Sequence, residues 1–244
     1  RAPPSRRRIR RQRAGTRRRL MRFRARNPNP SHPARHTLYL AATGGGKSQA
    51  LKWNPEIPRK GARVVGWDHA GDHPGLHFYG RQSFIRALKH GIGRGGGFRI
   101  FYAGDKDPRA WEWWCEVVWA FLDGDHMTYA IGEELSAVCE STGKATPNAA
   151  VLLNEGRKYG LVFHGTSQKP QEVSKTYFDQ CPIKFIGQQN SAAMCRRMSM
   201  ESGATVAEID ALQPMQFFRS DGRKGGAELI TVPYRAPAGV IWRD

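Results

Sequence analysis

Residues suited to binding phosphate lie in the stretch from Ala41 to Ser48, which reads Ala-Ala-Thr-Gly-Gly-Gly-Lys-Ser. Three consecutive glycines allow backbone angles and close approaches that side chains would block, so successive N–H groups can turn toward phosphate oxygens. Lysine followed by serine suits such a loop, because the ammonium reaches the β- and γ-phosphates and the hydroxyl ligates Mg²⁺. We therefore predict an ATP site, with Ser48 as a metal ligand and the following nucleotide-binding residues: Thr43, Gly44, Gly45, Gly46, Lys47, Ser48 and Gln49.

A phosphate loop needs a strand before it and a helix after it, and the flanking residues provide both. Residues 37–40 form a short apolar run typical of a buried strand, and residues 49–53 are compatible with a helix. Ala41 departs from the general pattern GxxxxGK[ST], which has glycine at this position, so the pattern does not specify the conformation of the turn that enters the loop. The alternative, a glycine-rich loop that carries Lys-Ser by chance, is disfavoured by the flanking context.

Two adjacent acids, Glu133 and Glu134, follow the apolar segment 127–132, which we predict to be a strand. Adjacent side chains on a strand point in opposite directions, so the two carboxylates can take separate tasks. We expect Glu133 to join the Mg²⁺ shell and Glu134 to polarise the attacking water. The alternative is an acidic helix N-terminus, where the helix dipole alone favours carboxylates.

A polar residue, Gln168, comes shortly after another apolar strand segment, residues 161–166. At the end of a central strand beside the strand that carries the acids, its amide is placed to sense the γ-phosphate. The predicted catalytic residues from this pattern are therefore Lys47, Glu134 and Gln168.

The remaining segments alternate between strand and helix patterns, which predicts an α/β fold. The expected strands are residues 63–67, 98–102 and 182–187, and the expected helices are residues 83–89, 111–122, 149–159 and 192–200. Residues 216–218 and 228–232 are expected to form a small C-terminal β-hairpin around three glycines. We predict one domain over residues 37–244, with a mostly parallel central sheet flanked by helices.

Three patterns are interpreted as structural rather than functional. His69, His73 and His77 are spaced by four, but glycines and a proline interrupt the helix that a metal site would need. Residues 91–96 match GxGxxG in the reverse of the dinucleotide-binding context, so we expect a flexible loop there. The tryptophan-rich helix at 111–122 is expected to fill the core and subunit contacts.

Composition places the positive charge in the N-terminal segment. Residues 1–36 hold 14 arginines and neither lysine nor acid, so they carry most of the formal charge of +18. Residues 1–26 are expected to be disordered until they bind an anion, and DNA, lipid headgroups or an acidic protein surface would all serve. A solvated tail or a localisation signal is the alternative. Asn27 to Pro33 reads as a proline-rich linker.

The cysteines and the hydropathy exclude other classes of protein. The four cysteines form no CxxC pair, which argues against a zinc site or a disulfide framework and favours a reducing, cytosolic setting. No apolar run reaches the roughly 18–20 residues of a membrane span, and the chain has no signal-peptide pattern.

Together, the motifs resemble the HerA/FtsK superfamily of P-loop ATPases that pump DNA. The resemblance covers about residues 37–232 and rests on TGGGKS at 43–48, YAIGEEL at 129–135 and GRKYGLVFHGTSQKPQEVSK at 156–175. Within the superfamily, the chain looks most like the genome-packaging ATPases of tailless, internal-membrane double-stranded DNA phages. Glu133 stands where aspartate is commoner, and the arginine-rich segment lies outside the shared core.

The resemblance implies a RecA-like (ASCE) fold and a ring-forming motor, usually a homo-hexamer, that translocates double-stranded DNA into a capsid. It implies a location in the host cytoplasm or at the packaging vertex of the virion, where residues 1–36 could meet capsid proteins or the viral membrane. A filamentous-phage assembly ATPase is one alternative. A non-enzymatic nucleic-acid-binding protein with a degenerate phosphate loop is another, and it leaves the order of loop, acids and glutamine unexplained.

Ring motors of this type place an arginine from one subunit against the γ-phosphate of its neighbour. Arg157 is the candidate for this role because it lies in the GRKYG block just before the strand of Gln168. Arg196 and Arg197 are the reserves. The alternative for Arg157 is a helix-capping cation, which the helix dipole favours.

Overall fold

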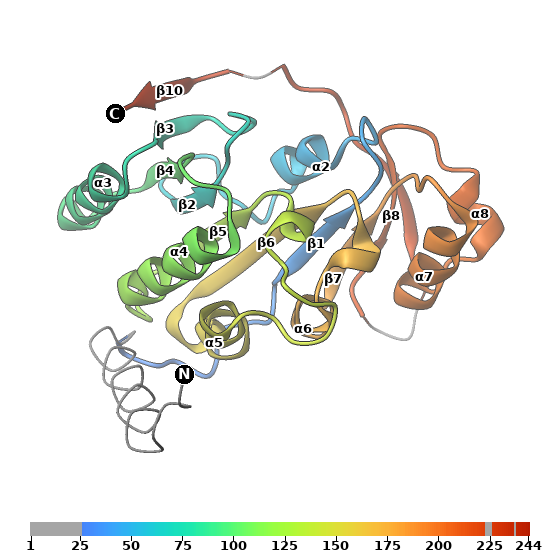
Figure 1. The fold of residues 1–244 in the computed structure, drawn as a ribbon, viewed down its shortest axis with the longest axis horizontal. Helices are drawn as coiled ribbons and strands as arrows, with labels where there is room; N and C mark the ends of the chain where they lie inside the picture. The colour runs from blue at the N-terminus through green and yellow to red at the C-terminus, as the bar shows by residue number, and fades with distance from the viewer. Residues whose placement is uncertain (1–25, 223–225, 237) are drawn as a thin grey trace, which may run out of the picture.

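Ten strands and seven α-helices are present in the residues that the computed structural model describes, 26–222, 226–236 and 238–244 (Figure 1). The strands are β1 (Thr37–Leu40), β2 (Arg63–Trp67), β3 (Gly75–Phe78), β4 (Phe98–Tyr102), β5 (Thr128–Gly132), β6 (Leu161–Ser167), β7 (Ile183–Ile186), β8 (Gln216–Ser220), β9 (Glu228–Thr231) and β10 (Val240–Arg243). The α-helices are α2 (Lys47–Trp53), α3 (Arg81–Gly93), α4 (Pro108–Phe121), α5 (Pro147–Glu155), α6 (Lys175–Gln180), α7 (Ala192–Ser202) and α8 (Val206–Asp210). The short 3-10 helices are η1 (Leu135–Ala137), η2 (Gly156–Tyr159) and η3 (Pro170–Glu172).

All ten strands form one sheet, in the order β10-β3-β4-β2-β5-β6-β1-β7-β8-β9. The strands from β10 to β7 in this order pair in parallel, whereas β8 and β9 are antiparallel. The strands β2, β5 and β6 are buried along their whole length, as the continuous apolar runs predict for a parallel sheet covered on both faces. The predicted mostly parallel α/β fold is thus confirmed.

The sheet brings three carboxyl ends together. Strand β6 lies between β1 and β5, so Leu40 stands opposite Ser167 and Gly132 stands opposite Gly165. The loops that leave these ends carry the phosphate loop, the two acids and Gln168. This topology confirms that the strand before Gln168 lies beside the acid-bearing strand.

The two faces of the sheet are covered by different elements. Helices α3 to α8 pack on one face and form the larger core, in which Trp111 and Trp114 are fully buried. Trp113 and Trp119 pack partly buried against the same core, so the core role of this helix is confirmed. On the other face, α2 and the loop residue Ile57 cover the sheet.

Several element ends differ from the sequence prediction for local reasons. Helix α4 begins at Pro108 because the Asp107 carboxylate accepts a hydrogen bond of 2.8 Å from the Ala110 N–H. The predicted helix over 149–159 divides into α5 and the 3-10 helix η2. The predicted loop at 91–96 is wrong for residues 91–93, because α3 continues to Gly93.

The C-terminal segment is the largest departure from the prediction. Strands β8 and β9 form the expected antiparallel pair. The chain then crosses the sheet and adds β10 in parallel to β3 at the opposite edge, as Figure 1 shows. Neither β3 nor β10 was expected, because each is short and gains its partner only in the folded sheet.

The linker is attached to the body of the protein at the amino ends of β5 and β6. The Asn29 N–H donates to the Lys158 carbonyl at 2.6 Å, and the His32 ring lies 2.8 Å from the Gly124 carbonyl. Residues 1–25, which include nearly all of the predicted arm, lie outside the described residues. In the described part, no helix has the length and apolar character that crossing a bilayer requires.

Candidate functional site

The phosphate loop connects the end of β1 to the first residue of α2. Gly46 has a φ of 95°, and a Cβ there would lie 2.5 Å from the Met215 sulfur, so only glycine fits. Ala41 is buried and keeps a negative φ, so the entry turn accepts a methyl group where the general pattern has glycine. The loop therefore has the strand, turn and helix context that a phosphate cradle needs.

Lys47 lies inside the loop that it serves. Its ammonium donates to the Ala42 carbonyl at 3.3 Å. Burial lowers the pKa of Lys47, and the negative charges of Glu134, Glu133 and Asp72 oppose that effect. The Lys47 ammonium thus lies close enough to interact electrostatically with the two predicted acids and with a third carboxylate, that of Asp72.

The carboxylates of the two acids have separate partners, although neither residue continues β5, which ends at Gly132. Glu133 is buried, with one carboxylate oxygen 2.5 Å from the His73 ring and the other accepting from the Thr166 hydroxyl. Glu134 has a φ of 54°, in the left-handed region, and its N–H donates to the same hydroxyl at 3.1 Å. Because the backbone turns at this residue, the Glu134 carboxylate points to a different neighbour.

That neighbour is Gln168. Its amide NH₂ donates to the Glu134 carboxylate at 2.8 Å, and its amide oxygen accepts from the Thr43 hydroxyl. One side chain therefore connects the phosphate loop to the acid pair.

Asp72 is a site residue that the sequence analysis missed. Its carboxylate accepts a hydrogen bond of 3.0 Å from the Ser48 hydroxyl, the predicted metal ligand. Ser48, Asp72 and Glu133 thus supply hydroxyl and carboxylate oxygens near the N-terminus of α2. Oxygen donors of this kind are those that Mg²⁺ prefers, so the residues fit the ion.

A buried aspartate holds the loop that carries Asp72 and His73. The Asp68 carboxylate accepts from three backbone N–H groups, those of residues 71–73, and from the His77 ring at 2.9 Å. Burial alone would raise the pKa of Asp68, but the hydrogen bond from His77, the charge of His73 and the backbone donors lower it to about 2. The carboxylate stays ionised and anchors the loop.

The three evenly spaced histidines do not converge. His69 lies against the Asp105 carbonyl at 3.2 Å, whereas His73 and His77 contact two different carboxylates. His73 thus holds Glu133 in place, and His77 holds Asp68. In the sequence, Asp68 follows β2 and Gly71-Asp72-His73 come three residues later, which was the only hint of these site residues. The local sequence did not show which partner each side chain would contact.

The side chain of Gln49 is engaged elsewhere. Its amide donates to the Arg235 carbonyl at 3.1 Å and accepts from the Arg235 N–H at 2.8 Å. The structure therefore brings Thr43, Lys47 and Ser48 to the site, but directs the Gln49 side chain to the C-terminal segment.

The candidate arginines also lie outside this cluster. Arg157 is at the amino end of β6, the end opposite Gln168, and its guanidinium donates to the linker carbonyls of Pro30, at 2.9 Å, and His32. Arg197 pairs with Glu201 at 2.9 Å and covers the Phe178 ring. Arg196 is exposed on α7.

Comparisons with known proteins place this site in context. No protein-family model matches the chain. Protein P9 of Pseudoalteromonas phage PM2 is 32% identical over 202 residues, which span 80% of this chain and 90% of that protein.

Two solved structures share the fold. The genome packaging NTPase B204 from Sulfolobus turreted icosahedral virus 2, in complex with AMPPCP, has a TM-score of 0.68 at 15% identity and covers 83% of this chain and 100% of its own. The bacterial conjugative coupling protein TrwBΔN70 has a TM-score of 0.61 at 12% identity, over 92% of this chain and 94% of its own. These neighbours confirm the α/β fold that the HerA/FtsK resemblance implies, and the identity with the relative from phage PM2 shows that the chain belongs to the family of Protein P9.

Proposed function

We propose that this chain is an ATPase that translocates double-stranded DNA and packages a viral genome into a preformed capsid. Its membership of the Protein P9 family and the fold that it shares with the genome packaging NTPase B204 support this function. The observation that carries the proposal is the chain of hydrogen bonds from Thr43 through Gln168 to Glu134. It links a phosphate loop to an acid that can activate water, which a mere anion-binding loop does not need.

The residues divide the work of phosphoryl transfer. The backbone of residues 43–48 and the Lys47 ammonium hold the β- and γ-phosphates, where positive charge stabilises the negative charge of the transition state. Glu134 orients the attacking water as the general base. Gln168 would sense the γ-phosphate, because its amide hydrogen-bonds both Thr43 in the phosphate loop and the Glu134 carboxylate. A γ-phosphate bound in the loop would therefore contact this amide.

Ser48, Asp72 and Glu133 are the residues that would hold Mg²⁺, which shields the charge of the phosphates when bound. The His73 ring and the Thr166 hydroxyl each contact one oxygen of Glu133 and so fix its orientation. These two act as positioning residues, since they reach the metal only through the carboxylate.

The working form in this proposal is a homo-hexameric ring around the DNA. Residues 1–36 would attach the ring to the capsid vertex or the viral membrane, or bind DNA directly, in the host cytoplasm or in the virion. Native mass spectrometry with ATP present tests the subunit number.

Steady-state ATP turnover with and without duplex DNA tests the function. The wild type should hydrolyse ATP, and duplex DNA should stimulate the rate. Lys47→Ala and Glu134→Gln should each lower turnover by at least about 100-fold, because each removes a group that acts on the transition state. Glu134→Gln should retain nucleotide affinity, whereas Lys47→Ala should lose it.

Glu140→Gln is the matched control, since Glu140 is an exposed acid close in sequence to the pair. Wild-type turnover in Glu134→Gln would transfer the base role to Glu133. DNA binding by a wild-type chain that hydrolyses no ATP would instead indicate the non-enzymatic alternative.

A further inference from the structure

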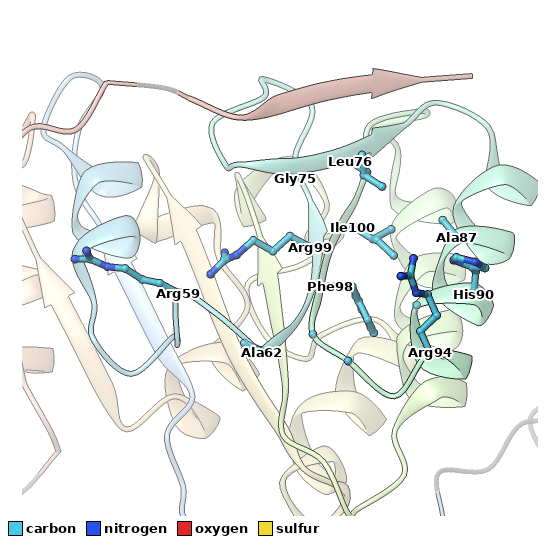
Figure 2. A pocket seen from close by; sticks show the side chains of 14 residues that line it. Arg59, Ala62, Gly75, Leu76, Ala87, His90, Arg94, Phe98, Arg99 and Ile100 are labelled. Carbon is cyan, nitrogen blue, oxygen red and sulfur yellow. The ribbon is translucent and has the colours of Figure 1, made fainter.

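Basic side chains line a cavity of about 730 Å³ between the loop before β2, strand β4 and the end of α3. They are Arg59, His90, Arg94 and Arg99, and we call these four with their cavity the basic groove. Among the described residues, no acid lines it. Figure 2 shows Arg99 extending from one side of β4 toward the loop of Arg59, with Arg94 and His90 on the other side.

Arg99 is a half-buried cation without a counter-charge. Its guanidinium donates to the Pro58 carbonyl at 2.9 Å, and burial lowers its pKa. Within the described part of the chain, neither Arg99 nor Arg59 nor Arg94 forms an ion pair. A charge that loses water without gaining an opposite charge costs free energy, so the arrangement favours an anion supplied from outside.

Helix α3 accounts for only part of the groove. His90 and Arg94 lie at its C-terminal end, where the helix dipole favours cations. That effect does not extend to Arg59, on a loop, or to Arg99, on a strand. The groove therefore collects cations from three separate elements around one cavity.

The basic surface continues toward the nucleotide site. A second cavity, of about 290 Å³, shares Arg59 and Arg99 with the groove and is also lined by Lys52, Arg235, Asp72 and His73. Asp72 contacts Ser48, and His73 contacts Glu133. Cations on both sides of β4, over two cavities that share Arg59 and Arg99, suit the repeated phosphates of a nucleic-acid backbone better than one small anion.

We propose that the basic groove binds the phosphate backbone of double-stranded DNA, with Arg59 and Arg99 as its central contacts. This assignment rests on the function proposed above, which makes duplex DNA the substrate. It places the DNA next to the loop of Asp72 and His73, whose side chains contact Ser48 and Glu133, two of the residues that would hold Mg²⁺.

The test is a titration of the full chain with a duplex oligonucleotide at several salt concentrations. The double variant Arg59→Ala with Arg94→Ala is compared with Arg86→Ala with Arg109→Ala, which removes two exposed arginines outside the groove. Each lost phosphate contact should reduce the slope of log affinity against log salt by about 0.9, so the groove variant should lose about 1.8. Its affinity at physiological salt should fall about 30-fold by the same relation, and the control should stay close to wild type.

Equal slopes in the groove variant and the control overturn the assignment, provided that the wild type binds DNA. A wild type that binds no duplex DNA contradicts the proposed function as well. Light scattering on the same samples detects the remaining outcome: a groove variant that no longer assembles but binds DNA with the wild-type slope would make the groove a contact between copies of the chain and overturn the proposal.

Arg99→Met gives an independent measurement. The substitution removes the unpaired charge and keeps an apolar stem, so its thermal unfolding midpoint should not fall, while its DNA affinity should fall about five-fold. Unchanged DNA affinity in this variant removes Arg99 from the proposed contacts.

Discussion

At the scale of single residues, Glu134 is held in a backbone conformation that residues other than glycine rarely adopt. Its φ of 54° lies in the left-handed region, which costs about 1–2 kcal/mol for a residue other than glycine. The hydrogen bond from its N–H to the Thr166 hydroxyl helps to keep it there. This backbone turn directs the Glu134 carboxylate to Gln168 and away from His73, so the carboxylates of Glu133 and Glu134 lie in different surroundings.

Buried histidines should make the protein sensitive to acid. Burial lowers the pKa of His164 to about 3, with the charges of His36 and His73 as smaller causes. Burial likewise lowers the pKa of His36 to about 4. The positive charge of Arg157 lowers this pKa further, whereas a backbone hydrogen bond raises it. In the unfolded chain both rings protonate near pH 6.5. The free energy of unfolding is therefore unaffected by these rings above about pH 6.5, and it decreases as the pH falls from there toward their folded-state pKa values.

We predict that His164→Leu flattens this dependence. Because one fewer proton is taken up on unfolding, the wild type should lose about 2 kcal/mol more of its free energy of unfolding between pH 7 and pH 5 than the variant loses. Urea unfolding at the two pH values measures the difference. Equal losses in both proteins would mean that His164 is already protonated in the folded state.

At the scale of elements, β10 ties the C-terminal segment to the loop beside the nucleotide site. The Trp242 ring lies 4.8 Å from the His77 ring and 5.3 Å from the Tyr79 ring, measured between centroids. His77 in turn contacts Asp68, which holds the loop of Asp72 and His73. The last strand therefore supports the site through two layers of side chains.

Trp242→Ala should lower the free energy of unfolding by about 1–2 kcal/mol, because aromatic packing on a half-exposed edge is lost. Tyr234→Ala is the control, since Tyr234 is 67% exposed and should change stability by less than about 0.5 kcal/mol. Urea unfolding compares the two. A Trp242→Ala protein as stable as the control would show that β10 contributes nothing to the fold in solution.

At the scale of the whole molecule, the linker and the nucleotide site lie at opposite ends of the sheet. Arg157 binds two linker carbonyls at the amino end of β6, and Gln168 follows the carboxyl end of the same strand. A strand of this length separates the two by about 20 Å, at about 3.3 Å per residue. The first described residue, Arg26, donates its N–H to the Leu122 carbonyl and so lies at the end of the sheet away from the candidate site.

Arg157→Ala should release the linker. We expect faster limited proteolysis within residues 27–36 than in the wild type or in Lys158→Ala, which removes the neighbouring exposed cation, because the two hydrogen bonds to Pro30 and His32 are lost. Turnover should stay within about two-fold of wild type if this contact is the whole role of Arg157.

The proposal that Arg157 acts on the nucleotide of a neighbouring subunit makes the opposite prediction for turnover. Arg157→Ala alone would then be inactive, and rings mixed with Glu134→Gln subunits would regain part of the activity, because some interfaces pair an intact Glu134 with an intact Arg157. Recovery in mixed rings would restore the arginine to the chemical step.

Much of the fold was predictable because the information was local. The apolar runs of β1, β2, β4, β5, β6 and β7 lie in sequence where the structure has them, since a strand covered on both faces needs a continuous apolar segment. Strand β3 carries glycine and histidine and lies opposite β10, which is 165 residues later in the paired register. No local pattern can show a strand whose partner arrives from the far end of the chain.

The sequence alone determined the phosphate loop, the acid pair and Gln168, because each is a short motif at the end of a strand that its own residues specify. Only the tertiary structure decided which side chains meet there. The Ser48 hydroxyl reaches Asp72 across 24 residues, and His73 reaches Glu133 across 60. It also turned Gln49 toward Arg235 and Arg157 toward the linker. Such contacts depend on the order of strands in the sheet, which long-range packing sets and local residue patterns do not.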